Sequence, residues 1–251
     1  MEPVKILVFL IITLLIFSGC LGDDSSSDGN GNDPGVIIDD DRTDDGNTSK
    51  NDTGPGYPVH ENITVTIFWI GEEAKEENGW VPNTRSAWDD KWMDHYGGID
   101  DPDDRNGYHP AGFTPKQNPF YFSMPYNDFG NDGKRKTEVS DLIYWSGDPE
   151  LGESDSMCKN RWIKITNGGK ISYAQWEDTG PFWEDDGGYV FGGDRPKGEA
   201  DGIAGLDVSP AVRDHLGLKN YDMVDWQFVD DQDVPDGPWK DIVTSMQTYW
   251  E

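Results

Sequence analysis

The pattern of apolar and polar positions divides the 251-residue chain into three parts. Residues 6–17 are almost all apolar, residues 22–56 contain little that could be buried, and residues 57–251 alternate short apolar runs with Gly- and Pro-rich turns. An apolar run of twelve residues is too short to span a bilayer but fits the central region of a signal peptide. The pattern therefore predicts a signal-peptide leader over 1–19, a disordered tether over 20–56 and one folded domain over 57–251.

Within the domain, runs of β-branched and aromatic residues bounded by turn residues predict strands. The segments that share this pattern are 63–70, 120–124, 162–166, 171–176 and 221–229. The third and fourth segments predict a hairpin, because Gly168 and Gly169 between them accept the positive φ that tight turns require.

Two segments have helical features. Large apolar residues recur at helical spacing over 84–96, before a Gly-Gly pair. A second helix is expected over 209–216, with Ser209 as its N-cap, Pro210 in its first turn and Gly217 behind it. Strands outnumber helices, and neither an internal repeat nor an alternating βαβ pattern occurs. We therefore expect a mainly β fold, a small barrel with one or two short helices and long loops.

The chain is strongly acidic, with 49 Asp and Glu against 20 Lys and Arg, a net charge of −29. Residues 23–56 hold ten Asp against one Arg and one Lys, which is −8, and the leader is neutral, so the domain carries the other −21. This sign excludes phosphate contacts by clustered Lys and Arg, and docking on anionic lipid by a basic patch. We expect no nucleic-acid partner and a monomeric protein.

The two cysteines have different predicted roles. Gly19-Cys20, after small and apolar residues, resembles a lipobox, which implies cleavage before Cys20 and attachment of lipid to its sulfur. The protein would then sit on the outer face of the cytoplasmic membrane, held by acyl chains. An N-terminal anchor helix with an incidental cysteine is the alternative. Cys158 has no partner for an internal disulfide, and we expect it to be a buried small side chain.

Few residues remain that could carry chemistry. The chain has no HExxH, CxxC or GxSxG motif and no phosphate-binding loop, so we expect no metal and no cofactor. Two carboxylates stand where a strand ends, Asp178 in 175–182 and Asp207 in 204–210. Two carboxylates that face one groove can perform acid–base chemistry on a glycosidic bond. The residues alone leave structural roles open, with Asp178 capping a turn and Asp207 capping a helix.

Four segments, in order, resemble rare lipoprotein A-like domains. Residues 165–182 resemble that family's hairpin and its Gly-Pro-Phe turn, and 206–217 resemble its Asp-Leu-Ser segment and the helix that follows. Residues 67–71 resemble its opening Trp-Tyr-Gly strand, and 124–125 its Leu-Pro pair. The resemblance implies a six-stranded double-psi β-barrel, the fold shared with barwin, expansins and family 45 cellulases.

The resemblance also implies roles for the two acids. The catalytic acid of the family's lytic transglycosylases corresponds to Asp178, and that of the related cellulases to Asp207. If the protein is an enzyme, we expect Asp178 to be the general acid and Asp207 its partner or an anchor of the groove. A transglycosylase His corresponds to Tyr121, and the second cellulase carboxylate falls near Ile70, with Glu72 and Glu73 close but unaligned. These departures put hydrolysis in doubt and leave expansin-like binding without cleavage open.

Aromatic side chains near the two acids complete the predicted site, because aromatic rings stack well on sugars. The expected substrate-binding residues are Tyr121, Tyr126, Trp176, Glu177 and Trp183. The alternative for Trp176 and Trp183 is a place in the core, to which we assign Trp162 and Trp226.

Together these features predict a surface lipoprotein that binds or modifies a polysaccharide, a neutral one given the charge of the domain. The alternative is a non-catalytic wall-binding or protein-interaction module in which Asp178 and Asp207 are structural.

The lipid anchor is directly testable. Cells that express the wild-type protein with a labelled lipid precursor should yield labelled protein, and Cys20→Ala should abolish the label because the acylated sulfur is gone. Label that persists in Cys20→Ala, or is absent from the wild type, contradicts the lipobox interpretation.

Overall fold

The computed structural model describes residues 56–76, 78–182 and 185–250. The predicted leader with Cys20, the predicted tether except Gly56, and Trp183 lie outside the described residues.

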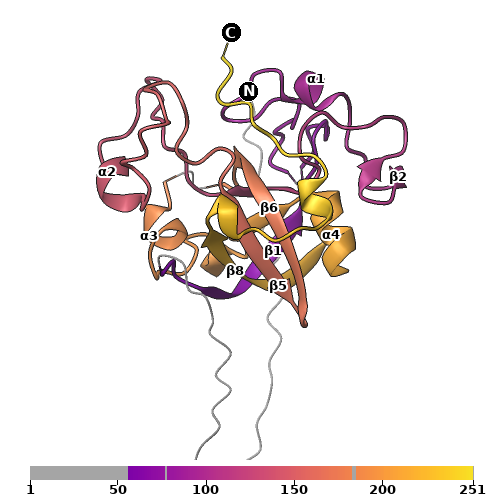
Figure 1. The fold of residues 1–251 in the computed structure, drawn as a ribbon. Helices are drawn as coiled ribbons and strands as arrows, with labels where there is room; N and C mark the ends of the chain where they lie inside the picture. Colours follow the sequence, from indigo (N-terminus) through magenta and orange to yellow (C-terminus); the bar gives the residue numbers. More distant parts are fainter. Residues whose placement is uncertain (1–55, 77, 183–184, 251) are drawn as a thin grey trace, which may run out of the picture. The chain divides into compact units, whose positions relative to one another are not determined.

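The described residues form a closed barrel of six strands, which confirms the predicted mainly β class (Figure 1). In order around the barrel the strands are β1 (His60–Ile67), β7 (Leu206–Val208), β4 (Tyr121–Met124), β6 (Lys170–Thr179), β5 (Trp162–Asn167) and β8 (Tyr221–Val229). The pairs β1·β7 and β4·β6 are parallel, and the other four pairs are antiparallel. This mixed topology is compatible with a double-psi barrel.

The remaining elements of the described residues are short. They are the two-stranded sheet β2 (Arg105–Asn106) and β3 (His109–Pro110), the helices α1 (Trp92–Tyr96), α2 (Val139–Leu142), α3 (Gly187–Val190) and α4 (Pro210–Leu216), and the 3-10 turns η1 (Glu199–Asp201), η2 (Asp231–Asp233) and η3 (Pro238–Lys240). No helix among the residues described is both long and apolar enough to cross a membrane.

The local predictions are confirmed at the hairpin and at α4. Gly168 and Gly169 have φ of 54° and 87° and join β5 to β6. The Ser209 hydroxyl accepts a hydrogen bond from the Val212 amide, and Gly217 ends α4 in the left-handed region. These features are predictable because turn glycines and helix caps depend on neighbouring residues of the chain rather than on distant contacts.

The helix expected over 84–96 is wrong over its first half, since α1 begins only at Trp92. The preceding backbone amides bond elsewhere: that of Ser86 donates to the Asp89 carbonyl and that of Ala87 to the Asp178 carboxylate. Helical spacing over this segment reflects burial of its tryptophans against the barrel rather than a helix.

Apolar side chains fill the barrel interior and a second cluster outside it. Trp162, Trp226 and Cys158 are buried as expected. The second cluster forms where segment 68–96 packs on the outer face of β4, and it contains Phe68, Ile70, Trp92, Tyr96 and Tyr121. This segment covers one end of β4 on the outside, and the site described next lies immediately beyond it.

Candidate functional site

A row of polar side chains crosses four neighbouring strands of the barrel. Ser123 of β4 pairs with Asp207 of β7 on one side and with Asp178 of β6 on the other. On its far side, Asp207 pairs with Thr66 of β1. Directly opposed residues of neighbouring strands point to the same face of a sheet. The two predicted acids therefore stand on one face, on either side of Ser123.

That face is the outer one. The residues that alternate with the row belong to the buried core of the barrel, namely Phe122 of β4, Trp176 of β6 and both Leu206 and Val208 of β7. Because alternate residues of a strand point to opposite faces, the row points away from the core.

Asp178 reaches the outer face through a β-bulge. The pairing of β4 with β6 steps from Phe122–Trp176 to Ser123–Asp178, so Glu177 is one extra residue on β6. Without the extra residue, Asp178 would share the inward face of Trp176, two positions before it. The bulge thus brings Asp178 into line with Asp207.

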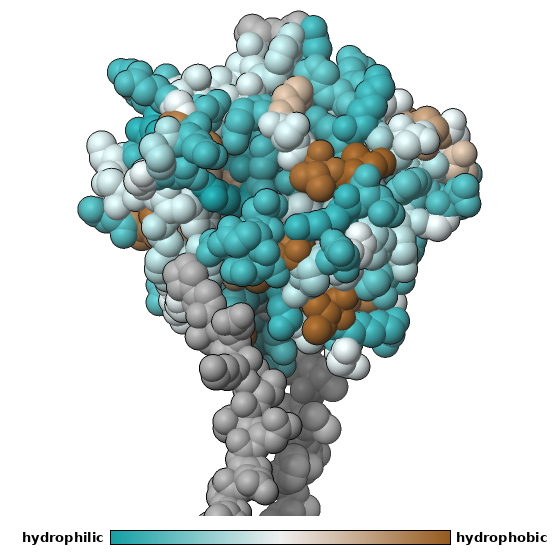
Figure 2. Space-filling model, in the orientation of Figure 1, coloured by the Kyte–Doolittle hydropathy of each residue, from teal (hydrophilic) through white to brown (hydrophobic). Residues whose placement is uncertain are grey.

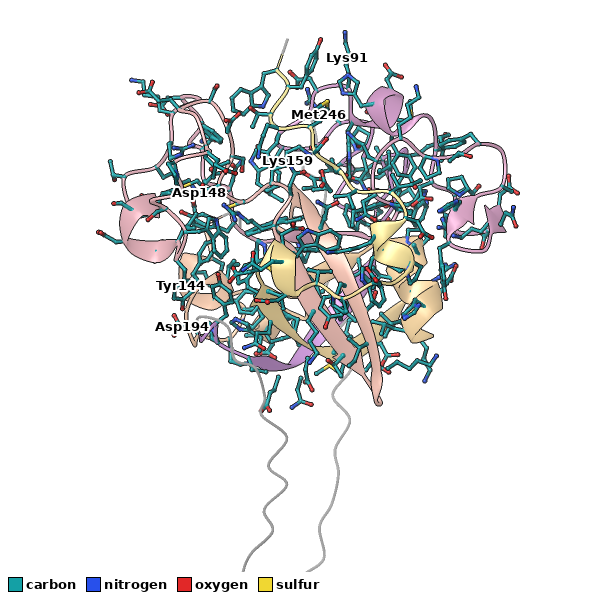
Figure 3. All side chains as sticks on the ribbon, viewed as in Figure 1. Lys91, Tyr144, Asp148, Lys159, Asp194 and Met246 are labelled. Carbon is teal, nitrogen blue, oxygen red and sulfur yellow. The ribbon has the colours of Figure 1, made fainter. Side chains whose placement is uncertain are left out.

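A buried ion pair lies at this bulge. The Glu177 carboxylate contacts the Lys159 ammonium, and both side chains are almost completely buried. Figure 3 places Lys159 near the end of β6, under the C-terminal segment that carries Met246. Glu177 was predicted to bind substrate; in the structure its carboxylate is instead occupied by Lys159 inside the protein.

The polar row opens into a cavity of about 540 Å³. The carboxylates of Asp178, Asp207 and Glu72 all line it, together with residues that include Thr66, Phe68, Asn78, Val81, Asn83, Ser123, Thr179, Gly180, Pro181, Phe182 and Asn220. A Cβ placed on Gly180 would lie 3.6 Å from Ser123 Oγ and 3.9 Å from Asp207 Oδ2, so the turn after Asp178 folds back against Asp207. We call this cavity the carboxylate groove.

Asp207 is the carboxyl group of the groove best suited to hold a proton. Burial and, to a smaller extent, the nearby charge of Glu72 together raise its pKa to about 6, against hydrogen bonds from the Thr66 and Ser123 hydroxyls. The helix-cap alternative for Asp207 is not what the structure shows, because Ser209 caps α4.

Asp178 has a different environment. Its Oδ1 accepts hydrogen bonds from the backbone amides of Ala87 and Thr179, each at 2.8 Å. Such bonds stabilise the ionised form of a carboxyl group. They also tie the segment before α1 to the end of β6, so Asp178 has a structural contribution whatever else it does.

Glu72 is a third carboxylate that the sequence left unaligned. It is buried, accepts a hydrogen bond from Asn83 Nδ2 at 3.2 Å and lies 3.6 Å from Lys75 Nζ. Burial raises its pKa, an effect that Lys75 opposes. Glu72 lies in the loop after β1, and only the fold of this loop places it in the lining of the groove.

The predicted aromatic residues Tyr121, Tyr126 and Trp176 are buried, Tyr121 under segment 68–96 on the outer face of β4, and all three are absent from the groove lining. The Tyr121 hydroxyl donates to Asp100 at 2.9 Å, the Tyr126 ring packs on Phe191, and the Trp176 ring packs between Phe122 and Trp88. This corrects the expectation that they stack on sugar, because no ring face is left for a ligand. Strand parity was the signal that could have placed Trp176 in the core.

Exposed apolar side chains do line the groove elsewhere. Phe182 and Val81 are exposed members of its lining, and Trp80 precedes Val81. Phe182 lay within the Gly-Pro-Phe turn of the sequence resemblance, but its neighbour Trp183 drew the prediction. In the described part of the chain, the groove included, no group of three or more His, Cys, Asp or Glu is placed to hold a metal ion.

Comparison with models of known protein families and with curated protein sequences found no match.

The ion pair at the bulge predicts a strong effect on stability. Lys159→Met should lower the free energy of unfolding by about 3–5 kcal/mol, because it leaves Glu177 buried without its counter-ion. The double variant Lys159→Met/Glu177→Leu should recover most of that loss, and the exposed Lys134→Met serves as a control with little effect. Denaturant unfolding measures all three; equal losses in the single and double variants contradict a coupled pair.

The raised pKa of Asp207 predicts a dependence of stability on pH. The folded protein binds the Asp207 proton more tightly than the unfolded chain, so the stability gained from this proton is complete below about pH 4 and is lost as pH rises through about 6. Asp207→Asn carries no charge at any pH. Its free energy of unfolding, relative to that of the wild type, should therefore rise by about 1–2 kcal/mol as the pH increases from 5 to 8. Unfolding measured across this range tests it; a difference independent of pH contradicts the raised pKa.

Proposed function

We propose that the protein is an extracytoplasmic lipoprotein that binds a polysaccharide in the carboxylate groove. The observation that carries the proposal is the outward row of Thr66, Asp207, Ser123 and Asp178, which opens into a cavity with exposed apolar side chains on its lining. Hydroxyls and carboxylates bond to sugar hydroxyls, and apolar side chains cover the C–H faces of sugar rings. The fold supports the same proposal, since it is compatible with the barrel of rare lipoprotein A-like domains and expansins.

The electrostatics favour a neutral glycan. The domain carries −21 of the net charge, and the face seen in Figure 2 is largely hydrophilic, with small separated apolar patches. Three carboxylates line the groove, and they would repel a uronic acid or a sulfated sugar.

If the groove cleaves its ligand, Asp207 is the general acid and Asp178 the ionised partner. A general acid needs a pKa near the working pH, which burial gives to Asp207, and two backbone amides fix the position of the Asp178 carboxyl group. This assignment follows the expansin and cellulase correspondence and reverses the transglycosylase one.

A non-catalytic binding module is the second candidate. The observation in its favour is the pair of backbone amides on Asp178, which gives this carboxylate a structural function without any reaction. In either case the proposed lipid on Cys20 and the acidic tether would display the barrel at the outer face of the cytoplasmic membrane.

Paired variants separate the two candidates. Asp178→Asn and Asp207→Asn should each lower release of soluble product from a panel of neutral polysaccharides by about 10²-fold or more, while pull-down by the same polysaccharide persists. The exposed Asp132→Asn is the matched control and should behave as the wild type. If the wild type is pulled down by a glycan but releases no product, the enzyme is rejected and the binding module is supported. If no neutral glycan pulls down the wild type, the proposed function is rejected.

A further inference from the structure

The polar row extends to a fifth strand. Thr66 of β1 pairs on its other side with Tyr221 of β8. The inward residues of β8 are Val224, Trp226 and Phe228, so Tyr221 points outward, and 58% of it is exposed. Asn220, the residue before it, already lines the groove. An exposed aromatic ring therefore stands at the β8 end of the row.

The other end of the row also carries exposed rings. Phe182 follows Asp178 in the turn after β6 and is 49% exposed, and Trp80 is 69% exposed. A Cβ on Gly79 would lie 2.8 Å from the Phe182 ring, so the loop that carries Trp80 meets the turn at this end. Four interstrand spacings separate the Tyr221 and Asp178 positions by about 19 Å, with the acids between the two ends.

Both residues that carry the exposed rings at the β6 end have an unusual backbone conformation. Trp80 has φ of 64° and Phe182 has φ of 44°, a region that bulky residues rarely adopt. Strained residues of this kind concentrate at ligand-binding sites, where the surrounding structure imposes the conformation. Here the strain exposes two aromatic rings to water, which core packing does not require.

We propose that the carboxylate groove is open at both ends and binds an internal stretch of a neutral glycan chain, which runs across the strands from Tyr221 to Phe182 and Trp80. The terminal rings stack on sugar rings, and the central Thr66, Asp207, Ser123 and Asp178 bond to hydroxyls of the sugars between them. This inference rests on the proposed function and adds the direction, the length and the specificity residues of binding. An exposed ring at each end makes the site suited to the interior of a chain.

Chain-length dependence tests the inference. The full-length protein is titrated by calorimetry with neutral disaccharides and hexasaccharides of glucose, mannose and N-acetylglucosamine. For the sugar that binds, Tyr221→Ala, Phe182→Ala and Trp80→Ala should each weaken the hexasaccharide about tenfold and the disaccharide much less, because only the longer ligand reaches the terminal rings. Tyr144→Ala is the matched control, since Tyr144 is 55% exposed but lies beside α3, outside the groove (Figure 3).

The outcomes separate this inference from the proposed function. Weakening at both ends with an unchanged Tyr144→Ala supports the open groove. Hexasaccharide binding by the wild type that none of the terminal variants weakens overturns the inference and keeps the proposed function. Weakening at one end alone also overturns it, in favour of a site for chain ends. If the wild type binds no neutral oligosaccharide, the proposed function fails with it.

Discussion

The site depends on one extra residue in β6. Glu177 forms the bulge that turns Asp178 outward, and the buried contact with Lys159 holds its side chain inside the protein. A buried ion pair is costly to desolvate, and its best attested use is to fix a register rather than to add stability. Here the register decides which face of the barrel carries the second acid. Without the bulge, the Asp178 side chain would point into the aromatic core of the barrel. Asp207 and Glu72 would then be the only two of the three carboxylates left in the groove.

The same register gives the two acids different environments. Asp207 lies in the middle of the row, where burial and the nearby Glu72 favour its protonated form. Asp178 lies at a strand end, where the backbone amides of Ala87 and Thr179 donate hydrogen bonds to its carboxyl group. Two carboxyl groups in different environments are the arrangement that acid–base chemistry uses. The polar row and the proposed chemistry therefore both follow from the pairing of β6 with β4.

The sequence predicted what local chemistry determines. The hairpin, the capped helix α4, the strand over 221–229 and the barrel class are confirmed, because turn glycines, an N-cap and strand periodicity act over a few residues. The same evidence named Asp178 and Asp207 as candidates. It misplaced Trp176, although strand parity indicates its inward position, and it misplaced Tyr121, whose burial depends on the packing of the distant segment 68–96 against β4. It also left out Ser123, Thr66 and Tyr221, since neither a bulge nor a cross-strand neighbour is visible in the sequence.

The central claim is that a neutral glycan binds across the outward row. The most direct measurement is an amide NMR map of the full-length protein, titrated with the neutral oligosaccharide that binds best. The account predicts that the largest shift changes fall on Thr66, Ser123, Asp178, Gly180 and Asp207. Shift changes confined to the separate cavity of about 410 Å³ that Tyr57, Trp145 and Arg161 line, with the row unaffected, would contradict it.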